Sequence, residues 1–400
     1  MSQPTDQRKL RVGIVGCGSI GNAHAVAYSD NPRVELVGVF DIIPERSKHY
    51  AARYGTTSYG SAGELLEQQP DLVSVATPPG SHTEVAVELL EGGSSVLLEK
   101  PPAINLVDMD TLAAADGASS GSLYVVFQHR HGSGARRAAS LLRSGALGVP
   151  QVAVCETLWY RPDSYFLPDW RGNWAGEGGG PTLGHGIHQI DLLLHLMGAW
   201  ETLDARAARI ARPVEFEDVS MAMVTFASGA VATVVTSLLS PRELSRVRVD
   251  TTGGTLEVNH VYGYRDADWS WTPAPDAETA ASLGRDPGMR SANGDRQPGS
   301  AGNDVWAASA GPDRPSNHAA QIDQLVDDLL AGRRHDTTLA STRPTMEFVT
   351  ALYASSIERA TVSRRDLTPD SRFYARLNGG LPADTITARM SAGNAAIGGS

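Results

Sequence analysis

The sequence predicts an α/β protein of two domains: a parallel sheet with helices on both faces, then an α+β domain with a large open antiparallel sheet. The 400 residues are enough for two hydrophobic cores. Up to residue 127, short apolar segments alternate with helical ones, as in a parallel sheet covered on both faces. After residue 148, strand-like segments joined by glycine turns follow one another, and such hairpins build antiparallel sheets.

The first domain is expected over residues 1–127. Its strand segments are short and almost entirely apolar, which suits strands that are buried on both faces. The predicted strands are 12–15, 34–40, 72–76, 96–98 and 123–127, and the predicted helices include 22–30, 44–53 and 83–90.

The second domain is expected over residues 128–388. A single strand opens it, two hairpins follow, and two helices close it. The strand is 151–159, the hairpins are 221–226 with 231–235 and 246–251 with 256–259, and the helices are 318–330 and 344–357. Thr342 is expected to be the N-cap of the last helix.

Two segments are rich in small and polar residues. They are 284–315 and 389–400, and neither has enough apolar area to offset the entropy lost on ordering. We expect the first to be a mobile insertion and the second a flexible tail.

Composition and charge exclude several classes of function. The formal net charge is −11, so the chain lacks the basic surface of a nucleic-acid-binding protein. No apolar run approaches the roughly 20 residues of a membrane span, and residues 1–9 lack the apolar core of a secretory signal. With Cys17 and Cys155 as the only cysteines, no structural disulfide is expected. We therefore expect a cytoplasmic protein without nucleic-acid or membrane partners.

A glycine-rich turn, Gly16-Cys17-Gly18-Ser19-Ile20-Gly21, follows the first predicted strand. With a strand before it, a helix after it and an acidic residue about 20 positions on, it predicts a dinucleotide-binding (Rossmann) domain. The first glycine permits the tight turn, the second lets the backbone approach a pyrophosphate, and the third lets helix and strand pack closely. An ordinary strand–helix turn is the alternative. The expected cofactor contacts are Gly16, Gly18, Ser19, Ile20 and Gly21.

Asp41, at the end of the second predicted strand, is the acidic residue of this pattern. A carboxylate there accepts hydrogen bonds from a ribose diol and repels a 2′-phosphate, which favours NAD over NADP. Arg46, a few residues further along, could weaken this preference for NAD over NADP. A carboxylate that only caps the next helix is the alternative.

Two more loops follow later strands of the predicted sheet. Thr77-Pro78-Pro79 closes the third strand and Glu99-Lys100-Pro101 follows the fourth. Ligands of open α/β sheets bind at the carboxyl ends of the strands, so both loops are expected to line the cofactor site. A rigid turn without ligand contact is the alternative for the proline segment. The expected cofactor contacts here are Thr77, Pro78, His82, Glu99 and Lys100.

With these motifs, the chain resembles the Gfo/Idh/MocA oxidoreductases, the relatives of glucose-fructose oxidoreductase and inositol dehydrogenase. The resemblance covers most of the chain. It rests on the glycine turn with His24 after it, Asp41, Thr77-Pro78-Pro79 with His82, Glu99-Lys100-Pro101, Gln128-His129-Arg130, and Gly178-Gly179-Gly180 before Gly186-Ile187-His188-Gln189-Ile190-Asp191. It implies an NAD(P)-binding domain, sugar or cyclitol substrates, and an open sheet that often forms the subunit interface. We therefore expect a homo-oligomer that assembles through this sheet.

The resemblance also implies a catalytic set. The family's site usually holds the lysine of the tripeptide, with an aspartate and a histidine four residues apart. These positions map to Lys100, Gly184 and His188, so the aspartate is missing here. Asp191 or His185 could orient the histidine in its place.

Lys100 and His188 are the expected catalytic pair. Oxidising a secondary alcohol requires a base for the hydroxyl proton and a positive group for the developing alkoxide. An imidazole, with a usual pKa of about 6.5, suits the base. A helix cap or a packed polar residue is the alternative for His188. His185, His188 and Asp191 drift off one helical face, so no metal site is predicted.

Further residues are expected on the substrate side. Aromatic faces stack on sugar rings, and guanidinium groups bind anionic groups. The candidates are Asp191, His185, Arg130, His131, Trp174 and Arg171. Packing of the aromatic-rich loop against the domain interface is the alternative for Trp174 and Arg171.

The expected function is hydride transfer between NAD(H) and a ring hydroxyl or ketone of a sugar, a cyclitol or a derivative of either. Two alternatives stay open. One is redox-neutral glycoside cleavage or epimerisation, in which NAD oxidises the sugar transiently and is then regenerated. The other is a non-catalytic NAD-sensing protein, which the missing aspartate at Gly184 keeps open.

Overall fold

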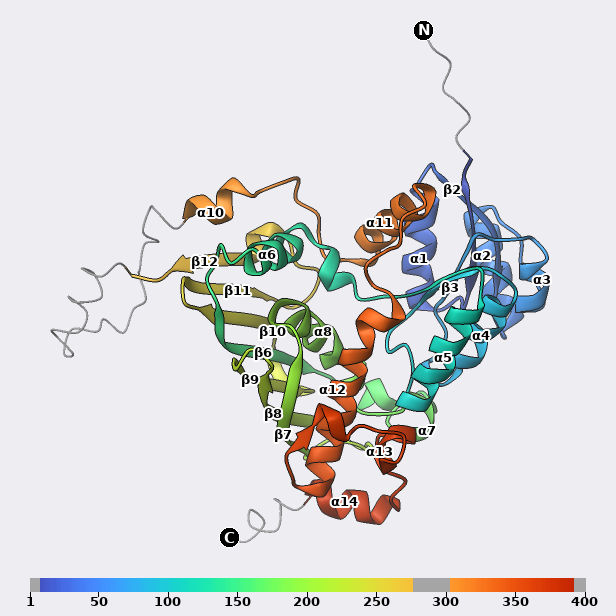
Figure 1. Ribbon diagram of the computed structural model, residues 1–400. Coiled ribbons are helices and arrows are strands. Elements are labelled where there is room, and N and C mark those ends of the chain that lie inside the picture. The colour runs from blue at the N-terminus through green and yellow to red at the C-terminus, as the bar shows by residue number, and fades with distance from the viewer. Residues whose placement is uncertain (1–7, 276–302, 392–400) are drawn as a thin grey trace, which may run out of the picture.

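The computed structural model describes residues 8–275 and 303–391, which form two sheets and the helices around them (Figure 1). The first sheet has the strand order β2-β1-β3-β4-β5, and all its pairs are parallel. Its strands are β1 (Leu10–Val15), β2 (Val34–Phe40), β3 (Leu72–Val75), β4 (Ser95–Leu98) and β5 (Leu123–Val125). Its helical segments are α1 (Ser19–Ser29), α2 (Pro44–Tyr54), α3 (Ala62–Leu66), η1 (Pro79–Ser81), α4 (His82–Glu91) and α5 (Leu106–Ala118).

The second sheet has eight strands in the order β12-β11-β10-β6-β9-β8-β7-β13. They are β6 (Pro150–Tyr160), β7 (Trp200–Ala208), β8 (Val219–Phe226), β9 (Val231–Ser237), β10 (Leu239–Thr251), β11 (Gly254–His260), β12 (Trp269–Pro273) and β13 (Val362–Ser363). The longer helices are α6 (Ser133–Arg143), α8 (Ile187–Met197), α11 (His318–Leu330), α12 (Leu339–Glu358) and α14 (Ala383–Ser391). The short helical segments are η2 (Gln128–His131), η3 (Asp163–Phe166), α7 (Trp174–Glu177), η4 (Thr182–Gly186), η5 (Asp266–Asp268), α10 (Asn303–Ala308), η7 (Arg364–Asp366) and α13 (Arg372–Ala375).

The predicted strands and hairpins are confirmed, with one difference in pairing. β8 with β9 and β10 with β11 are antiparallel hairpins, as expected. However, β6 pairs with β9 in parallel, so the second sheet is mixed. The hairpin pattern could not reveal this pair, because it joins strands that α8 and two further strands separate along the chain.

Two predicted helix starts are wrong. α1 begins at Ser19 instead of residue 22, because Gly18 is its N-cap. α12 begins at Leu339, where the Thr338 side chain accepts the first-turn amide. Thr342, the predicted N-cap, is buried inside this helix, and Pro344 also lies within it. Proline inside a helix costs one backbone hydrogen bond, which the extensive burial of α12 offsets.

The two segments expected to be irregular are only partly described. Of the expected insertion 284–315, residues 284–302 lie outside the described residues, whereas 303–308 form α10. Trp306 of α10 packs against Trp269, with ring centroids 6.2 Å apart, and Arg137 lies 4.0 Å from the Trp306 ring. Of the expected tail 389–400, residues 392–400 lie outside the described residues, and α14 continues to Ser391.

The two sheets are joined by helices from late in the chain. α12 lies between them, packing against β7 and α8 on one side and α5 on the other (Figure 1). α11 packs on α1 (Figure 1), and its Ile322 and Leu325 share a core with Val12 and Ile14 of β1. By packing, α11 therefore belongs with the first sheet, although it follows the second sheet in sequence.

One face of the second sheet lacks a helical cover among the described residues. Side chains alternate along its strands, so that every second residue points away from α8 and α12. The outward positions near the middle are apolar and exposed: Val152, Met221, Met223 and Val231. Within the described ranges, no helix has both the length and the hydropathy needed to cross a membrane.

Candidate active site

The glycine turn lies at the carboxyl end of β1, as a nucleotide site requires. Gly16 has a φ of +99°, and a Cβ there would lie 2.6 Å from the carbonyl oxygen of Ala76. A Cβ at Gly21 would lie 2.1 Å from the carbonyl oxygen of Gly16. Both positions therefore need glycine. At Gly18 a Cβ would meet no atom within 4 Å, so this side of the turn is open.

The start of α1 fits a phosphate group. Gly18 caps the helix without a side-chain hydrogen bond, and the first turn holds no acidic residue. Ser19 and Ile20 are exposed there. Helix N-termini of this kind bind anions through free backbone amides and the helix dipole. The residues present therefore fit the pyrophosphate of a dinucleotide.

Asp41 follows β2 beside the glycine turn. Its Oδ2 accepts the amide of Cys17 at 2.7 Å, and its Oδ1 accepts the amide of Ile43 at 2.8 Å. A carboxylate has further lone pairs, so Asp41 can brace the turn and still accept a ribose hydroxyl. Burial, with Asp41 nearby, raises the pKa of the Cys17 thiol to about 12, which keeps the thiol protonated.

His82 holds the loop after β3 against the loop after β4. Its Nδ1 lies 2.8 Å from the carbonyl oxygen of Pro101, and its Nε2 lies 2.9 Å from that of Thr77. The residue is fully buried, and both ring nitrogens are occupied. These contacts give His82 a positioning role, and its predicted contact with the cofactor stays a prediction.

Glu99 also acts as an anchor. Its Oε1 lies 2.9 Å from Nε2 of His24 and 3.0 Å from Nε2 of His318, and its Oε2 accepts the amide of Lys100. Burial opposes ionisation, but the two histidines lower the pKa of Glu99 well below its usual range. The side chain is almost wholly buried and ties α1 and α11 to β4, and its predicted contact with the cofactor stays a prediction.

Lys100 extends from this anchor to the second domain. Its Nζ donates to the carbonyl oxygen of Gly184 at 3.0 Å. Gly184 lies in η4, a π-helical turn directly before α8. Burial lowers the pKa of Lys100, although the Glu99 carboxylate opposes the shift. A Cβ at Gly184 would meet no atom within 4 Å, so the space for an aspartate side chain there is open.

His185 lies in η4 next to Gly184, and His188 lies in the first turn of α8 that follows. Burial, reinforced by the Lys100 charge, lowers the pKa of both imidazoles well below their usual range. Both rings are therefore neutral at neutral pH. The structure brings one ammonium and two neutral imidazoles together where the two domains meet.

Aromatic packing, not a carboxylate, surrounds His188. Its ring lies edge-on to His129 and Tyr262, with centroids 5.3 Å and 5.8 Å away. Among the described residues, its buried Nδ1 has no hydrogen-bond partner. Burial lowers the pKa of His129 to about 3, so this neighbour is neutral too. Neither Asp191 nor His185 makes the orienting hydrogen bond that we expected.

Three of the predicted substrate contacts are held by other parts of the chain, and their role in substrate binding stays a prediction. Arg130 and Asp191 form a bidentate ion pair with distances of 2.6 Å and 2.5 Å, and their side chains are only 8% and 1% exposed. Thr345 also donates to Asp191 at 2.9 Å. His131 is buried against His335. Arg130 thus joins η2 to α8 and to the start of α12, whereas His131 packs on the loop between α11 and α12.

Of the two candidates in the aromatic-rich loop, Arg171 lies beside the site and Trp174 packs away from it. Arg171 lies 4.0 Å from the Tyr165 ring and 4.2 Å from the Trp170 ring, and its charge acts on Lys100. The Tyr165 hydroxyl lies 3.4 Å from Nε2 of His185. Arg171 therefore lies beside the site. Trp174 instead packs edge-on against Phe216 and Tyr353, which favours the packing alternative for this ring.

Several residues at the site are missing from the predicted set. His129 belongs to the Gln128-His129-Arg130 run, but the pattern does not show that His129 rather than Arg130 faces the site. Tyr165 and Tyr262 lie between the longer strands and helices, where no spacing indicates their direction. The additional residues at the site are Gln128, His129, Tyr165, Glu177 and Tyr262.

This arrangement defines a dinucleotide-dependent oxidoreductase, with the nucleotide turn on one domain and a lysine and histidines where the domains meet. Residues 10–126 match the family model described as "Oxidoreductase family, NAD-binding Rossmann fold". Residues 135–257 match the GFO/IDH/MocA C-terminal domain. Together the matches cover more than half of the chain, which belongs to the Gfo/Idh/MocA oxidoreductase family.

Known proteins similar to this chain include sugar dehydrogenases. The UDP-N-acetylglucosamine 3-dehydrogenase of Acidithiobacillus ferrooxidans is 28% identical over 63% of this chain and 77% of the relative. The D-glucoside 3-dehydrogenase of Escherichia coli is 28% identical over 63% of this chain and 78% of the relative. The WlbA dehydrogenase of Chromobacterium violaceum, solved with NADH and UDP-GlcNAcA, superposes with a TM-score of 0.75 at 25% identity, covering 91% of this chain and 98% of that one.

Proposed function

We propose that this protein is an NAD-dependent dehydrogenase that oxidises a ring hydroxyl of a sugar or sugar derivative, or reduces the corresponding ketone. The observation that carries the proposal is the meeting of Lys100, His185 and His188 at the carboxyl edge of the sheet that holds the glycine turn. When bound, NAD⁺ supplies the acceptor for the hydride that leaves the carbinol carbon.

His188 accepts the hydroxyl proton. Because burial lowers its pKa, the ring keeps a free nitrogen lone pair at neutral pH. The proton moves from the substrate oxygen to this lone pair while the carbon–hydrogen bond breaks, which leaves a ketone and a protonated His188. In the reductive direction His188 returns the proton.

Lys100 donates a hydrogen bond to the same oxygen. Charge develops on that oxygen as its proton leaves, and a fixed cation in a poorly hydrated site stabilises it strongly. The contact from Nζ to the Gly184 carbonyl holds the ammonium toward η4 and His188. Lys100 thus stabilises the charge on the substrate oxygen, and His188 takes up the proton.

We propose the 3-hydroxyl of a hexopyranose ring as the reacting group. Three similar proteins are named as 3-dehydrogenases of UDP-N-acetylglucosamine, D-glucosides and glucose-6-phosphate. In this chain, Arg171 lies against the Tyr165 and Trp170 rings beside Lys100, with Glu177 as a partner at 3.5 Å. Such a surface suits a sugar ring that carries an anionic substituent.

A substrate panel tests this function. The purified chain is incubated with NAD⁺ and hexosides, hexose phosphates, nucleotide sugars or cyclitols, and the absorbance of reduced nicotinamide is followed. Net reduced nicotinamide with at least one hexose derivative is expected. Product formation without net reduced nicotinamide would instead establish redox-neutral cleavage or epimerisation. Cofactor binding without turnover of any compound would favour the NAD-sensing alternative.

The Asp41 carboxylate predicts a preference for NADH over NADPH. A 2′-phosphate placed near it would meet like charge, a cost of up to several kcal/mol at an interface. The dissociation constants of both cofactors, measured by protein fluorescence, are expected to differ by at least about tenfold, or 1.4 kcal/mol. In Asp41→Asn the difference should narrow, whereas Asp30→Asn, an exposed control on the C-cap of α1, should leave it unchanged. Equal affinities in the unaltered chain would contradict the preference.

Replacing Lys100 with methionine is expected to lower kcat by about 10²- to 10³-fold, the loss typical of removing one electrostatic donor. NADH affinity, measured separately, should change far less than kcat, because the glycine turn and Asp41 stay intact. Lys48→Met, an exposed lysine on α2, is the matched control. Turnover that survives Lys100→Met would remove this residue from the mechanism.

We also propose that a second copy of the chain covers the apolar middle of the open sheet. Val152, Met221, Met223 and Val231 form an exposed apolar stripe there, and such patches mark association surfaces. Light scattering is expected to give a multiple of the chain mass, and Met223→Asp should reduce it. A single-chain mass for the unaltered protein would contradict this assignment.

A further inference from the structure

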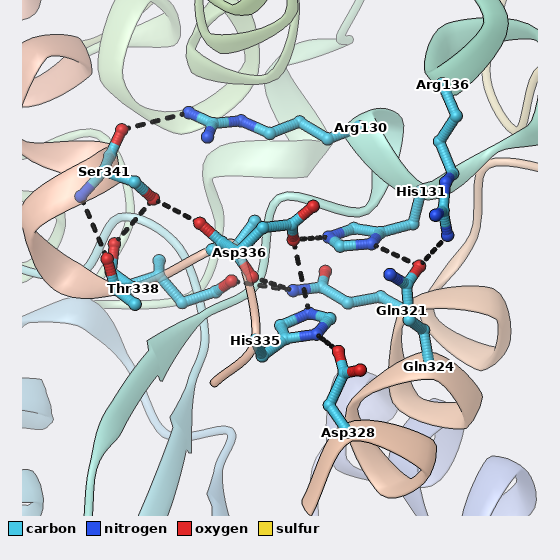
Figure 2. Close-up of polar contacts among 12 residues, drawn as sticks. Arg130, His131, Arg136, Gln321, Gln324, Asp328, His335, Asp336, Thr338 and Ser341 are labelled. Carbon is cyan, nitrogen blue, oxygen red and sulfur yellow. Dashed lines mark hydrogen bonds and ion pairs between the residues drawn. The ribbon is translucent and has the colours of Figure 1, made fainter. Parts of the chain in front are cut away.

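A second cluster of titratable side chains lies outside the active site (Figure 2). His131 ends η2, and His335 and Asp336 lie in the loop between α11 and α12. The two imidazoles stack, with centroids 4.8 Å apart and planes 11° from parallel. Both histidines are 1% exposed. We call these three residues the His131–His335–Asp336 cluster.

Hydrogen bonds determine which nitrogen of each ring carries the proton. Nδ1 of His335 lies 2.8 Å from Oδ2 of Asp328, a carboxylate that can only accept, so this nitrogen bears the hydrogen. Nδ1 of His131 lies 3.2 Å from Oε1 of Gln324. Arg136 donates to the same Gln324 oxygen at 2.6 Å, which identifies it as the acceptor. In both neutral rings, therefore, Nε2 presents a lone pair.

These two lone pairs converge on a third electron-rich atom. Nε2 of His131 and Nε2 of His335 lie 3.7 Å and 3.8 Å from Oδ1 of Asp336. Both nitrogens are buried and have no hydrogen-bond partner among the described residues. All three atoms lie within 4.8 Å of one another. Three acceptors with no hydrogen between them repel one another unless a cation sits among them.

The nearby arginines do not supply that cation. The Arg130 guanidinium is held by Asp191 and by the carbonyl oxygen of Ser341. The Arg136 guanidinium donates a hydrogen bond to Gln324. Figure 2 shows both imidazoles pointing at Asp336, with Arg130 turned toward Ser341.

We propose that the His131–His335–Asp336 cluster binds one zinc ion, or a similar divalent transition metal, through two imidazole nitrogens and one carboxylate oxygen. In tetrahedral zinc sites with metal–ligand distances of about 2.0–2.2 Å, neighbouring ligand atoms lie about 3.3–3.6 Å apart. The observed 3.7 Å and 3.8 Å need only a small shift of Asp336, whose side chain is 63% exposed and able to move. This exposure also leaves room for water as the fourth ligand.

The surroundings match those of known metal ligands. A histidine that binds a metal almost always donates its other ring hydrogen to a carboxylate or carbonyl group, which fixes the ring and raises its basicity. Asp328 plays this part for His335 and Gln324 for His131. No part of this arrangement is needed for the proposed hydride transfer.

The other histidine–carboxylate cluster lacks this property. In the group of His24, Glu99 and His318, Oε1 of Glu99 lies 2.9 Å and 3.0 Å from the two Nε2 atoms. These are hydrogen-bond distances, so protons already occupy the space between the atoms. We therefore assign the metal to the His131–His335–Asp336 cluster alone.

The position indicates what the ion does. The loop of His335 and Asp336 connects α11, which packs on α1, to α12, which lies between the two sheets. His131 is next to Arg130, whose ion pair holds α8, and two residues from His129, which packs on His188. A metal ion bound here would link the loop between α11 and α12 to η2. It would thereby hold η2, and with it His129, in place beside His188.

Metal titration of the full chain, prepared without a histidine tag and stripped with a chelator, tests the proposal. Calorimetry is expected to show one Zn²⁺ per chain, and Co²⁺ should give the intense visible absorption of a tetrahedral site. Asp336→Asn and His131→Gln should each weaken Zn²⁺ binding by more than tenfold. Asp328→Asn, which alters the partner of His335 and Arg333 but removes no proposed metal ligand, should weaken it by about 10- to 100-fold.

Controls separate this site from other histidines. His49→Gln, on the surface of α2, should bind Zn²⁺ like the unaltered chain. His318→Gln, in the other cluster, should also retain binding. Asp336 is exposed, so Asp336→Asn is expected to fold, and its circular dichroism spectrum verifies this. No Zn²⁺ uptake by the unaltered chain, or equal affinity in a folded Asp336→Asn, would overturn the proposal.

Discussion

Replacing His188 with glutamine is expected to lower kcat by about 10²- to 10⁴-fold, the contribution of a positioned general base. Glutamine fills much of the same space but cannot take up a proton at neutral pH. The ring is buried between His129 and Tyr262, so the replacement must be of similar size to keep these rings packed. Steady-state turnover with saturating NAD⁺ gives the ratio.

The pH dependence identifies the base. Burial and the Lys100 charge hold the pKa of His188 well below its usual value of 6.5. A group with a lowered pKa stays neutral as the pH falls through 6.5 and is protonated only further down. In the unaltered chain kcat/KM should therefore stay level through pH 6.5 and fall at more acidic pH. In His188→Gln this acid limb should disappear.

His195 offers a matched control on the same helix. It lies two turns further along α8, and burial lowers its pKa to about 4, but it does not contact Lys100. His195→Gln should retain turnover and the acid limb of the profile. If His195→Gln and His188→Gln lose activity equally, the loss comes from disturbing α8, and the assignment of the base to His188 fails.

Replacing Asp191 with asparagine is expected to lower the free energy of unfolding by about 3–5 kcal/mol, because it leaves the buried guanidinium of Arg130 without its counter-charge. The two side chains are 1% and 8% exposed, so water cannot compensate. Thr345 and the Ser341 carbonyl also depend on this pair for their contacts. Urea denaturation followed by circular dichroism measures the change.

Two comparisons make this test specific. Glu35→Gln breaks the exposed pair with Arg11 and should cost less than about 1 kcal/mol. The double variant Arg130→Met with Asp191→Leu removes both charges and should recover much of the stability lost in Asp191→Asn. A stable Asp191→Asn variant whose only defect is a raised KM would instead favour the predicted substrate contact of Asp191.

Most of the first domain could be predicted from local sequence. A parallel strand buried on both faces must be apolar throughout, which made β2 and its neighbours recognisable. The glycine turn was equally clear, because backbone geometry at Gly16 and close contact at Gly21 exclude side chains. Asp41, Lys100 and His188 could be proposed as site residues because ligands of open α/β sheets bind at the carboxyl ends of the strands and because the family resemblance supplies the matching positions.

The directions of neighbouring side chains could not be predicted. Within η2, His129 packs on His188, Arg130 enters an ion pair with Asp191, and His131 stacks on His335. Successive residues of a tight helical turn point in different directions, and the pattern of residue types does not say which direction leads to the site. The sequence therefore suggested Arg130 and His131 as substrate contacts and passed over His129.

The sequence by itself determined the strands of the first sheet, the two hairpins of the second and the place of the glycine turn, because periodicity and glycine geometry are properties of short stretches of chain. The tertiary structure alone decided that α11 joins the first sheet, that β6 runs parallel to β9, and that His131, His335 and Asp336 meet. These contacts join segments far apart along the chain. Their formation depends on how whole helices and strands pack together, and the pattern of residues within a short stretch of sequence does not indicate that packing.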